Sequence, residues 1–231
     1  NLSRKGWNIG LIPQLQWTFT NDRYYSYEKS EYLYKHQFNY GIKYYQTLPV
    51  TNSGYFPKWG FGISFMGGCA PWTGENFGNM VYANGYFYFP GITPQQGLKI
   101  TLSAQKQNVD GKIYYLSSYA SLPRGYRDLT PTEVFAKATL DYAIPIYLGD
   151  YNLWSVLYFK RMTILPFVDY AIDSVPNMKQ SLYWSAGTDL LFDIYPLRFN
   201  VPVSVGVRYA YTGPQNGNRN YFQFLFSLDL P

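Results

Sequence analysis

The chain has 231 residues, of which 21% are aromatic and only 14% charged, and its formal net charge is +5. A soluble domain usually carries about 25% charged residues, yet no apolar run reaches the roughly 18 residues that a transmembrane helix needs. Single Cys and His residues, Cys69 and His36, exclude an intrachain disulfide and a Cys- or His-based metal site. Basic runs are absent, which argues against nucleic-acid binding. This composition favours contact with lipid through alternate residues of β-strands.

The first half of the chain alternates between apolar and polar residues. Over residues 7–19 the apolar side chains fall on one face and the polar side chains on the other, and a period of two predicts a β-strand. This strand exceeds the mean of about 5–6 residues in soluble sheets and matches the 9–11 residues that cross a bilayer. Four further strands are predicted at residues 34–48, 59–66, 80–89 and 98–105. We expect the Tyr-rich residues 21–32 to be a loop.

The second half begins with residues 108–131, the longest interval without alternation, where we expect a loop. Five strands are predicted after it, at residues 132–145, 158–172, 181–192, 201–211 and 221–229, with a long apolar gap at 146–157. Short connections mostly alternate with longer polar ones, as in outer-membrane barrels with periplasmic turns and extracellular loops. The sequence therefore predicts one all-β domain over residues 1–231, a transmembrane antiparallel β-barrel of about ten strands in this chain. Its long loop, at 108–131, would be lumenal or extracellular.

A soluble β-sandwich or lipocalin-like barrel is the alternative fold. Such a fold hides its apolar face, so its outer face should carry abundant Lys and Glu. The polar faces of this chain instead hold mostly Gly, Ser, Thr, Gln and Tyr with isolated charges. We therefore favour the membrane barrel. In that setting His36 is expected near the membrane interface, and Cys69 is expected to be a packed free thiol.

Charged residues in the second half fall on the polar faces of the strands. Phe167 and Asp169 share the inward face of their strand, and Asp141 and Asp189 lie on the inward faces of the strands before and after it. A carboxylate that faced lipid would be costly, so we place these acids in the lumen. Arg124 comes from a loop long enough to fold back into the lumen. We expect it to make a bidentate contact with Asp169.

Two short motifs in this region resemble those of a known family. Residues 123–126, Pro-Arg-Gly-Tyr, are similar to the V-R-G-[FY] motif of a long loop, and residues 167–171 are similar to F-x-D-x-G in a later strand. Together they resemble the C-terminal half of the BamA/TamA/FhaC superfamily, the outer-membrane assembly and secretion barrels of the bacterial surface antigen family. Pro123 replaces the Val, Ala171 the final Gly and Asp141 a Glu of the family, so we expect local differences in the loop and strand.

The resemblance implies a fold and a function for the whole chain. Family barrels have sixteen strands, five of them after the motif loop, so this chain would supply the C-terminal ten. Arg124, with Gly125 and Tyr126 beside it, would pack against Phe167 and Asp169 inside the barrel. The implied function is insertion, assembly or translocation of proteins at the bacterial outer membrane, through a seam that the strand at residues 221–229 borders. The implied partners are outer-membrane lipid and lipopolysaccharide, client outer-membrane or secreted proteins, and periplasmic or lipoprotein accessory subunits.

Other functions remain open on the sequence. Arg124 and Asp169 would also suit an ordinary lumenal salt bridge that stiffens a loop. The chain would then be a complete ten-stranded pore or a structural subunit of an envelope complex, or a surface receptor that uses its Tyr-rich residues 21–34. Asp141, Asp169 and Asp189 could mimic a catalytic carboxylate pair. Without a nucleophile motif such as G-x-S-x-G we expect no enzyme and no cofactor.

Overall fold

The computed structural model describes residues 2–4, 6–26, 31–51, 53–71, 78–108, 116, 118–127, 133–153, 157–174, 181–196, 203–214, 217 and 219–228. Within these residues the chain forms one antiparallel sheet of eleven strands, whose order in the sheet is their order in the chain. The strands are β1 Leu2–Arg4, β2 Trp7–Ser26, β3 Glu31–Thr47, β4 Gly60–Cys69, β5 Met80–Pro90, β6 Gly97–Gln107, β7 Val134–Leu153, β8 Leu157–Ser174, β9 Ser181–Pro196, β10 Val203–Thr212 and β11 Asn220–Leu228. No helix in this part of the chain is long and apolar enough to cross a membrane.

The predicted all-β class and the ten predicted strands are confirmed, and the structure adds the three-residue strand β1. The loop predicted at residues 21–32 is wrong, because β2 runs to Ser26 and β3 begins at Glu31, with Tyr24 opposite Leu33. Tyrosines have high strand propensity, and pairing with a neighbouring strand extends a segment whose own alternation is weak.

The apolar gap predicted at residues 146–157 is also wrong. The strand β7 continues to Leu153 and β8 starts at Leu157, so the two strands form one long hairpin. Their register shifts between Tyr147 and Tyr151. Three residues of β7 there lie opposite a single residue of β8, and Gly149 among them has a φ of 69°. An irregularity of this kind interrupts the alternating pattern, which explains why the period of two was lost there.

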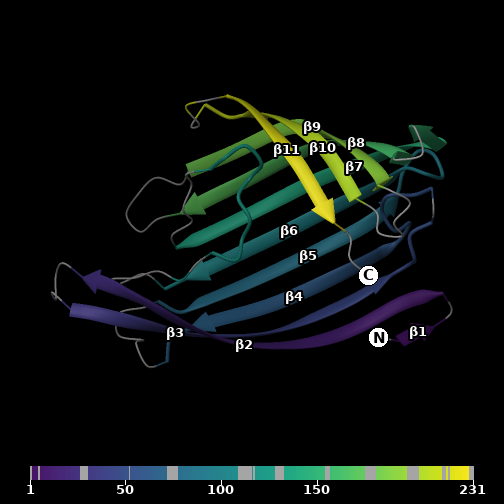
Figure 1. Ribbon diagram of the computed structural model, residues 1–231. Coiled ribbons are helices and arrows are strands. Elements are labelled where there is room, and N and C mark those ends of the chain that lie inside the picture. The colour runs from purple at the N-terminus through teal and green to yellow at the C-terminus, as the bar shows by residue number, and fades with distance from the viewer. Residues whose placement is uncertain are drawn as a thin grey trace.

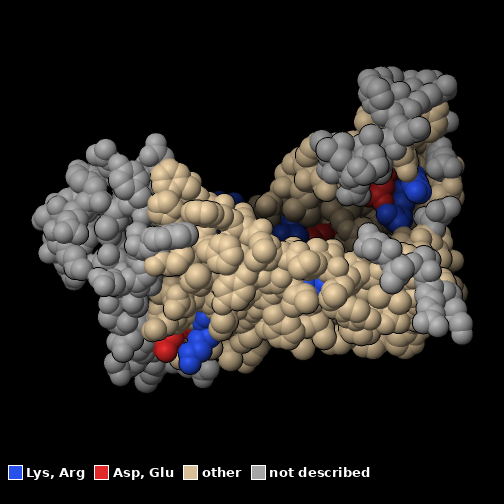
Figure 2. Space-filling model, turned by 90° about the horizontal axis from the view of Figure 1, so that it is seen from below, with Lys and Arg blue, Asp and Glu red and all other residues tan. Residues whose placement is uncertain are grey.

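The sheet curves strongly, so that it has a concave and a convex face (Figure 1). Side chains on the convex face are mainly apolar and exposed, as the three β11 phenylalanines Phe222, Phe224 and Phe226 show. Among the convex-face side chains that the structure describes in β2 to β11, Lys106 and His36 are the sole Lys, Arg, His, Asp or Glu. Figure 2 shows charged side chains in the hollow of the sheet and a second charged group at one end of an otherwise largely uncharged outer wall.

The loop between β6 and β7 crosses the concave face, and the best-buried residues lie beneath it. Leu116 of this loop packs with the buried Ala70 and Met80. Gln105 of β6 then accepts hydrogen bonds through Oε1 from Ser118 Oγ at 2.9 Å and from the backbone N of Tyr119 at 2.9 Å. Ala120 then packs against the buried Phe135 and Ala171 of β7 and β8. The loop therefore covers a small core on the sheet and continues toward the later strands (Figure 1).

Candidate functional site: an arginine locked beneath the loop

A tight turn at residues 123–126 directs Arg124 toward the sheet. The backbone N of Tyr126 donates to the carbonyl oxygen of Pro123 at 3.2 Å, and Gly125 has a φ of 94°. A positive φ at the third residue is typical of a type II turn and favours glycine there. A glycine therefore follows Arg124 because it permits the positive φ of this turn, and the turn directs the Arg124 side chain toward the sheet.

Arg124 meets Asp169 of β8 through three hydrogen bonds. Its Nε and Nη2 atoms donate to the two carboxylate oxygens, each at 2.9 Å, and its backbone N donates to Oδ2 at 2.8 Å. The ring of Phe167 lies 3.5 Å from the guanidinium carbon. Asp169 is fully buried. The predicted bidentate contact is thus present, and it is of the fork-to-fork type that gives arginine its geometric specificity.

The other two predicted acids also lie beside Arg124. Its Nη2 is 2.7 Å from Oδ1 of Asp141, whereas its Nη1 is 4.0 Å from Oδ2 of Asp189. Burial works to lower the pKa of the Arg124 guanidinium, but Asp169 and Asp141 outweigh it, and the pKa is raised above its ordinary value. Arg124 therefore stays charged and serves as the common counterion of the two nearest carboxylates.

Gly125 and Tyr126 carry the loop onward to β9 and β10. The Tyr126 hydroxyl donates to the carbonyl oxygen of Trp184 at 3.1 Å and accepts from the backbone N of Gly213 at 3.1 Å. A Cβ added to Gly125 would lie 2.6 Å from Cγ2 of the buried Thr212. All three residues of the predicted loop motif therefore make specific contacts with the concave face.

The substitution Gly125→Ala is expected to destabilise the fold by about 2–3 kcal/mol, because it adds a steric overlap with Thr212 to the strain of a positive φ. Urea unfolding followed by tryptophan fluorescence would measure this loss. Gly149→Ala is the matched control, since Gly149 has a φ of 69° and no atom within 4 Å of the added Cβ. It should cost about 1–2 kcal/mol from backbone strain alone, and equal losses would contradict tight packing at Gly125.

Pro123 and Ala171, two of the residues that differ from the motifs this region resembles, are accommodated by packing. Pro123 is fully buried and starts the turn. Ala171 is fully buried too, and its methyl group packs in the core with Ala120 and Phe135. A glycine at residue 171 would leave that space unfilled. These two residues therefore adapt the loop and the strand to each other.

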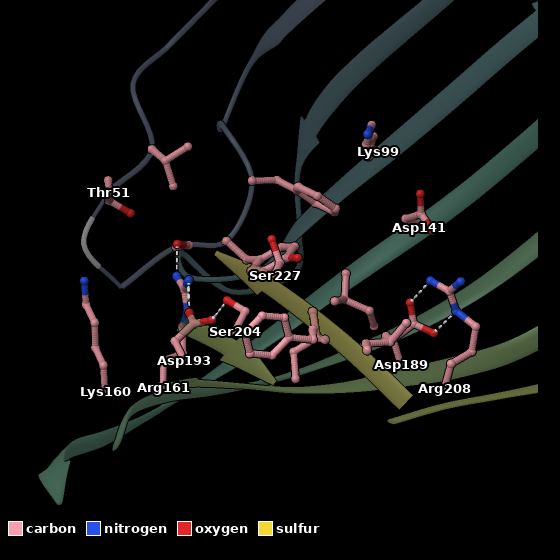
Figure 3. Close-up of a pocket in the computed structure, with 18 of the residues that line it drawn as sticks. Thr51, Lys99, Asp141, Lys160, Arg161, Asp189, Asp193, Ser204, Arg208 and Ser227 are labelled. Carbon is pink, nitrogen blue, oxygen red and sulfur yellow. Dashed lines mark hydrogen bonds and ion pairs between the residues drawn. The ribbon is translucent and has the colours of Figure 1, made fainter. Parts of the chain in front are cut away.

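Sequence reasoning missed a second set of ionic contacts further along the concave face. Arg208 of β10 holds Asp189 through two hydrogen bonds of 2.7 and 2.6 Å. Arg161 of β8 pairs with Asp193, which also accepts from Ser204 Oγ at 2.6 Å. The alternation places these residues on polar faces, but their partners depend on the register between strands. Figure 3 shows both ionic groups in the hollow.

The site as a whole is an ion-pair network that fastens a loop to a sheet. Each of its carboxylates at residues 141, 169, 189 and 193 has an arginine partner, so none is an uncompensated acid. Such an arrangement can hold a long segment in one place inside a curved sheet. Comparison of the chain with protein-family models, with curated proteins and with solved structures finds no match.

Proposed function

We propose that the chain forms the C-terminal part of a sixteen-stranded β-barrel in a bacterial outer membrane, where it inserts or translocates other proteins. The convex face supports the membrane placement, because it is apolar and almost free of charge over the described strands. Monomeric soluble proteins rarely expose apolar patches larger than a few hundred Å². Lipid around the sheet would cover this surface, while the charged concave face would line the lumen.

The ends of the sheet support the role in protein insertion. β1 and β11 stand at the two ends of the strand order, with no pairing between them in the described residues. An unpaired strand edge can accept another strand through backbone hydrogen bonds. In the proposed protein the edge of β11 borders the seam, and a client strand would pair with that edge.

The Arg124–Asp169 contact is the single observation that carries the functional proposal. Through it and its neighbours the loop is joined to β8, β9 and β10. We propose that the loop holds β8, β9 and β10 at one fixed curvature. This part of the sheet would then be rigid, and β11 would keep its position at the seam. The resemblance in motif and in loop position is the basis for assigning this device to an assembly or secretion barrel.

A client-insertion assay tests the proposal. The full-length protein in liposomes should accelerate the folding of a urea-unfolded outer-membrane client, measured by heat-modifiable gel mobility, relative to empty liposomes. In a Cys69→Ser background, a cysteine at Ser227 of β11 should cross-link to a cysteine in the client. The same change at Ser103 of the internal strand β6 is the matched control and should not cross-link. Unchanged client folding together with ion conductance would instead indicate a pore or structural barrel.

A further inference from the structure

An apolar groove crosses the convex face of the sheet. Its volume is about 790 Å³, within the range of about 300–1,000 Å³ that is typical of ligand pockets. Residues of six neighbouring strands, β2 to β7, line it, and apolar side chains such as Leu15 and Phe65 are exposed there. Five intervals of about 4.8 Å between neighbouring strands make the groove about 24 Å long. This length suits an extended hydrocarbon chain better than a compact ligand.

The register between strands gives the groove its shape. Over β4, β5 and β6 it is formed by two neighbouring rows of cross-strand partners, which are Phe65, Ala83 and Ala104 in one row and Gly67, Val81 and Lys106 in the other. Residues two apart in a strand are about 7 Å from each other, so the rows enclose a narrow space. Glycine and alanine leave the surface low there, while the phenylalanine ring stands above it.

Lys106 brings a positive charge to this apolar groove. Its side chain is exposed, and its cross-strand partners are Val81 and Val134. Glu133, the acid next to Val134, donates no salt-bridge oxygen to it, and Lys106 has no salt bridge within the part of the chain that the structure describes. The groove therefore combines an apolar trough with one positive charge that no carboxylate neutralises in these residues.

Lys106 would lie close to lipid headgroups in the proposed membrane placement. It is the second-last residue of β6, Gly97–Gln107, four residues from the central Leu102. A rise of about 3.4 Å per residue and a strand tilt of about 40° put its Cα about 10 Å from the level of Leu102 along the membrane normal. The apolar band of such barrels is about 25 Å tall, so this Cα is near its edge. The flexible lysine stem lets the ammonium reach the headgroups.

We propose that the groove binds one membrane lipid with a net negative headgroup. The acyl chain lies in the apolar trough, and the headgroup accepts a charge-assisted hydrogen bond from the Lys106 ammonium. A free anion would leave the trough uncovered, and a lipid without net charge would leave the ammonium uncompensated, so an anionic lipid matches both features. This inference rests on the proposed membrane placement and adds a lipid-selective site to it. It does not depend on the insertion of client proteins.

Native mass spectrometry of the full-length protein in detergent tests this inference, with dioleoyl phosphatidylglycerol and dioleoyl phosphatidylcholine as separate probes. We expect the anionic lipid to bind about fivefold more tightly, and this preference to shrink as salt is added. Lys106→Gln should abolish the preference, whereas Lys106→Arg should keep it. Ala83→Phe would fill the trough and should weaken both lipids about fourfold or more, the effect of losing contact with about one buried methylene group.

Two matched controls accompany these variants, and circular dichroism would show which of them fold. Lys43→Gln removes the same charge from the concave face of β3, opposite Ser64, and should keep the preference. Val207→Phe adds the same bulk as Ala83→Phe to the convex face of β10, outside the groove, and should keep both affinities.

Equal affinities of the two lipids for the folded protein would overturn the proposal. A preference that survives in Lys106→Gln would overturn it too, as would an equal loss in Lys43→Gln. Equal affinities together with accelerated client folding in liposomes would overturn the lipid site alone. A clear lipid preference without client folding would support the lipid site and overturn the insertion role alone.

Discussion

Arg124→Gln is expected to destabilise the protein by about 3–5 kcal/mol, because it removes the cation from a buried ion pair. Asp169 is fully buried and receives both guanidinium hydrogen bonds from Arg124. Asp141 would lose its partner at 2.7 Å in the same step. Two carboxylates would then share a poorly solvated site, and their repulsion would add to the cost of each.

The measurement is equilibrium unfolding in urea, with the protein in detergent or lipid vesicles. Arg127→Gln is the matched control, because Arg127 belongs to the same loop but is exposed, and its contacts are with Tyr221. That substitution should cost less than about 1 kcal/mol. Similar losses in the two variants would show that the loop does not depend on the buried pair.

A double variant separates the pair from its surroundings. Asp169→Asn keeps an acceptor for the Arg124 backbone N–H but removes the charge. Combined with Arg124→Gln, it should recover part of the stability lost in Arg124→Gln alone, because one of the two unpaired carboxylates is gone. A double-mutant cycle would give a coupling energy of about 0.5–3 kcal/mol for residues in contact. Strict additivity would contradict the direct interaction.

Leu102→Arg is expected to destabilise the protein by about 2–4 kcal/mol in lipid vesicles, because it would place a charge at the middle of the bilayer. Leu102 is the central residue of β6, Gly97–Gln107, and its side chain on the convex face is 49% exposed. In a protein whose convex face met water, the same substitution would usually stay within about 0.5 kcal/mol. The change therefore discriminates between lipid and water on this face.

Ile92→Arg provides the matched control, since Ile92 is 92% exposed in the turn that follows β5. Its replacement should have little effect in either environment, because the turn lies outside the strands. Unfolding of both variants would be followed in vesicles of the same lipid. A negligible effect of Leu102→Arg in vesicles would be inconsistent with the proposed membrane barrel.

The sequence by itself determined which side chains share a face of the sheet. Alternation is a local property, since successive side chains of a strand point to opposite faces. For that reason the inward placement of Asp141, Asp169 and Asp189 could be predicted residue by residue, and the exposed phenylalanines of β11 could be predicted in the same way. The contact between Arg124 and Asp169 was predictable because an inward-facing carboxylate needs a cation, and the loop is long enough to bring Arg124 to the same face of the sheet.

The tertiary structure alone decided how these faces are aligned. Asp189 is opposite Arg208 in the register of β9 and β10, so it pairs chiefly with Arg208 and lies 4.0 Å from Arg124. The hydrogen bond from Arg161 to Gly54, in the turn at residues 48–59 between β3 and β4, was also beyond prediction. Register and loop placement depend on contacts between residues distant in sequence, whose energies do not appear in any local pattern. The sequence therefore determined the faces, and the folded sheet determined the partners.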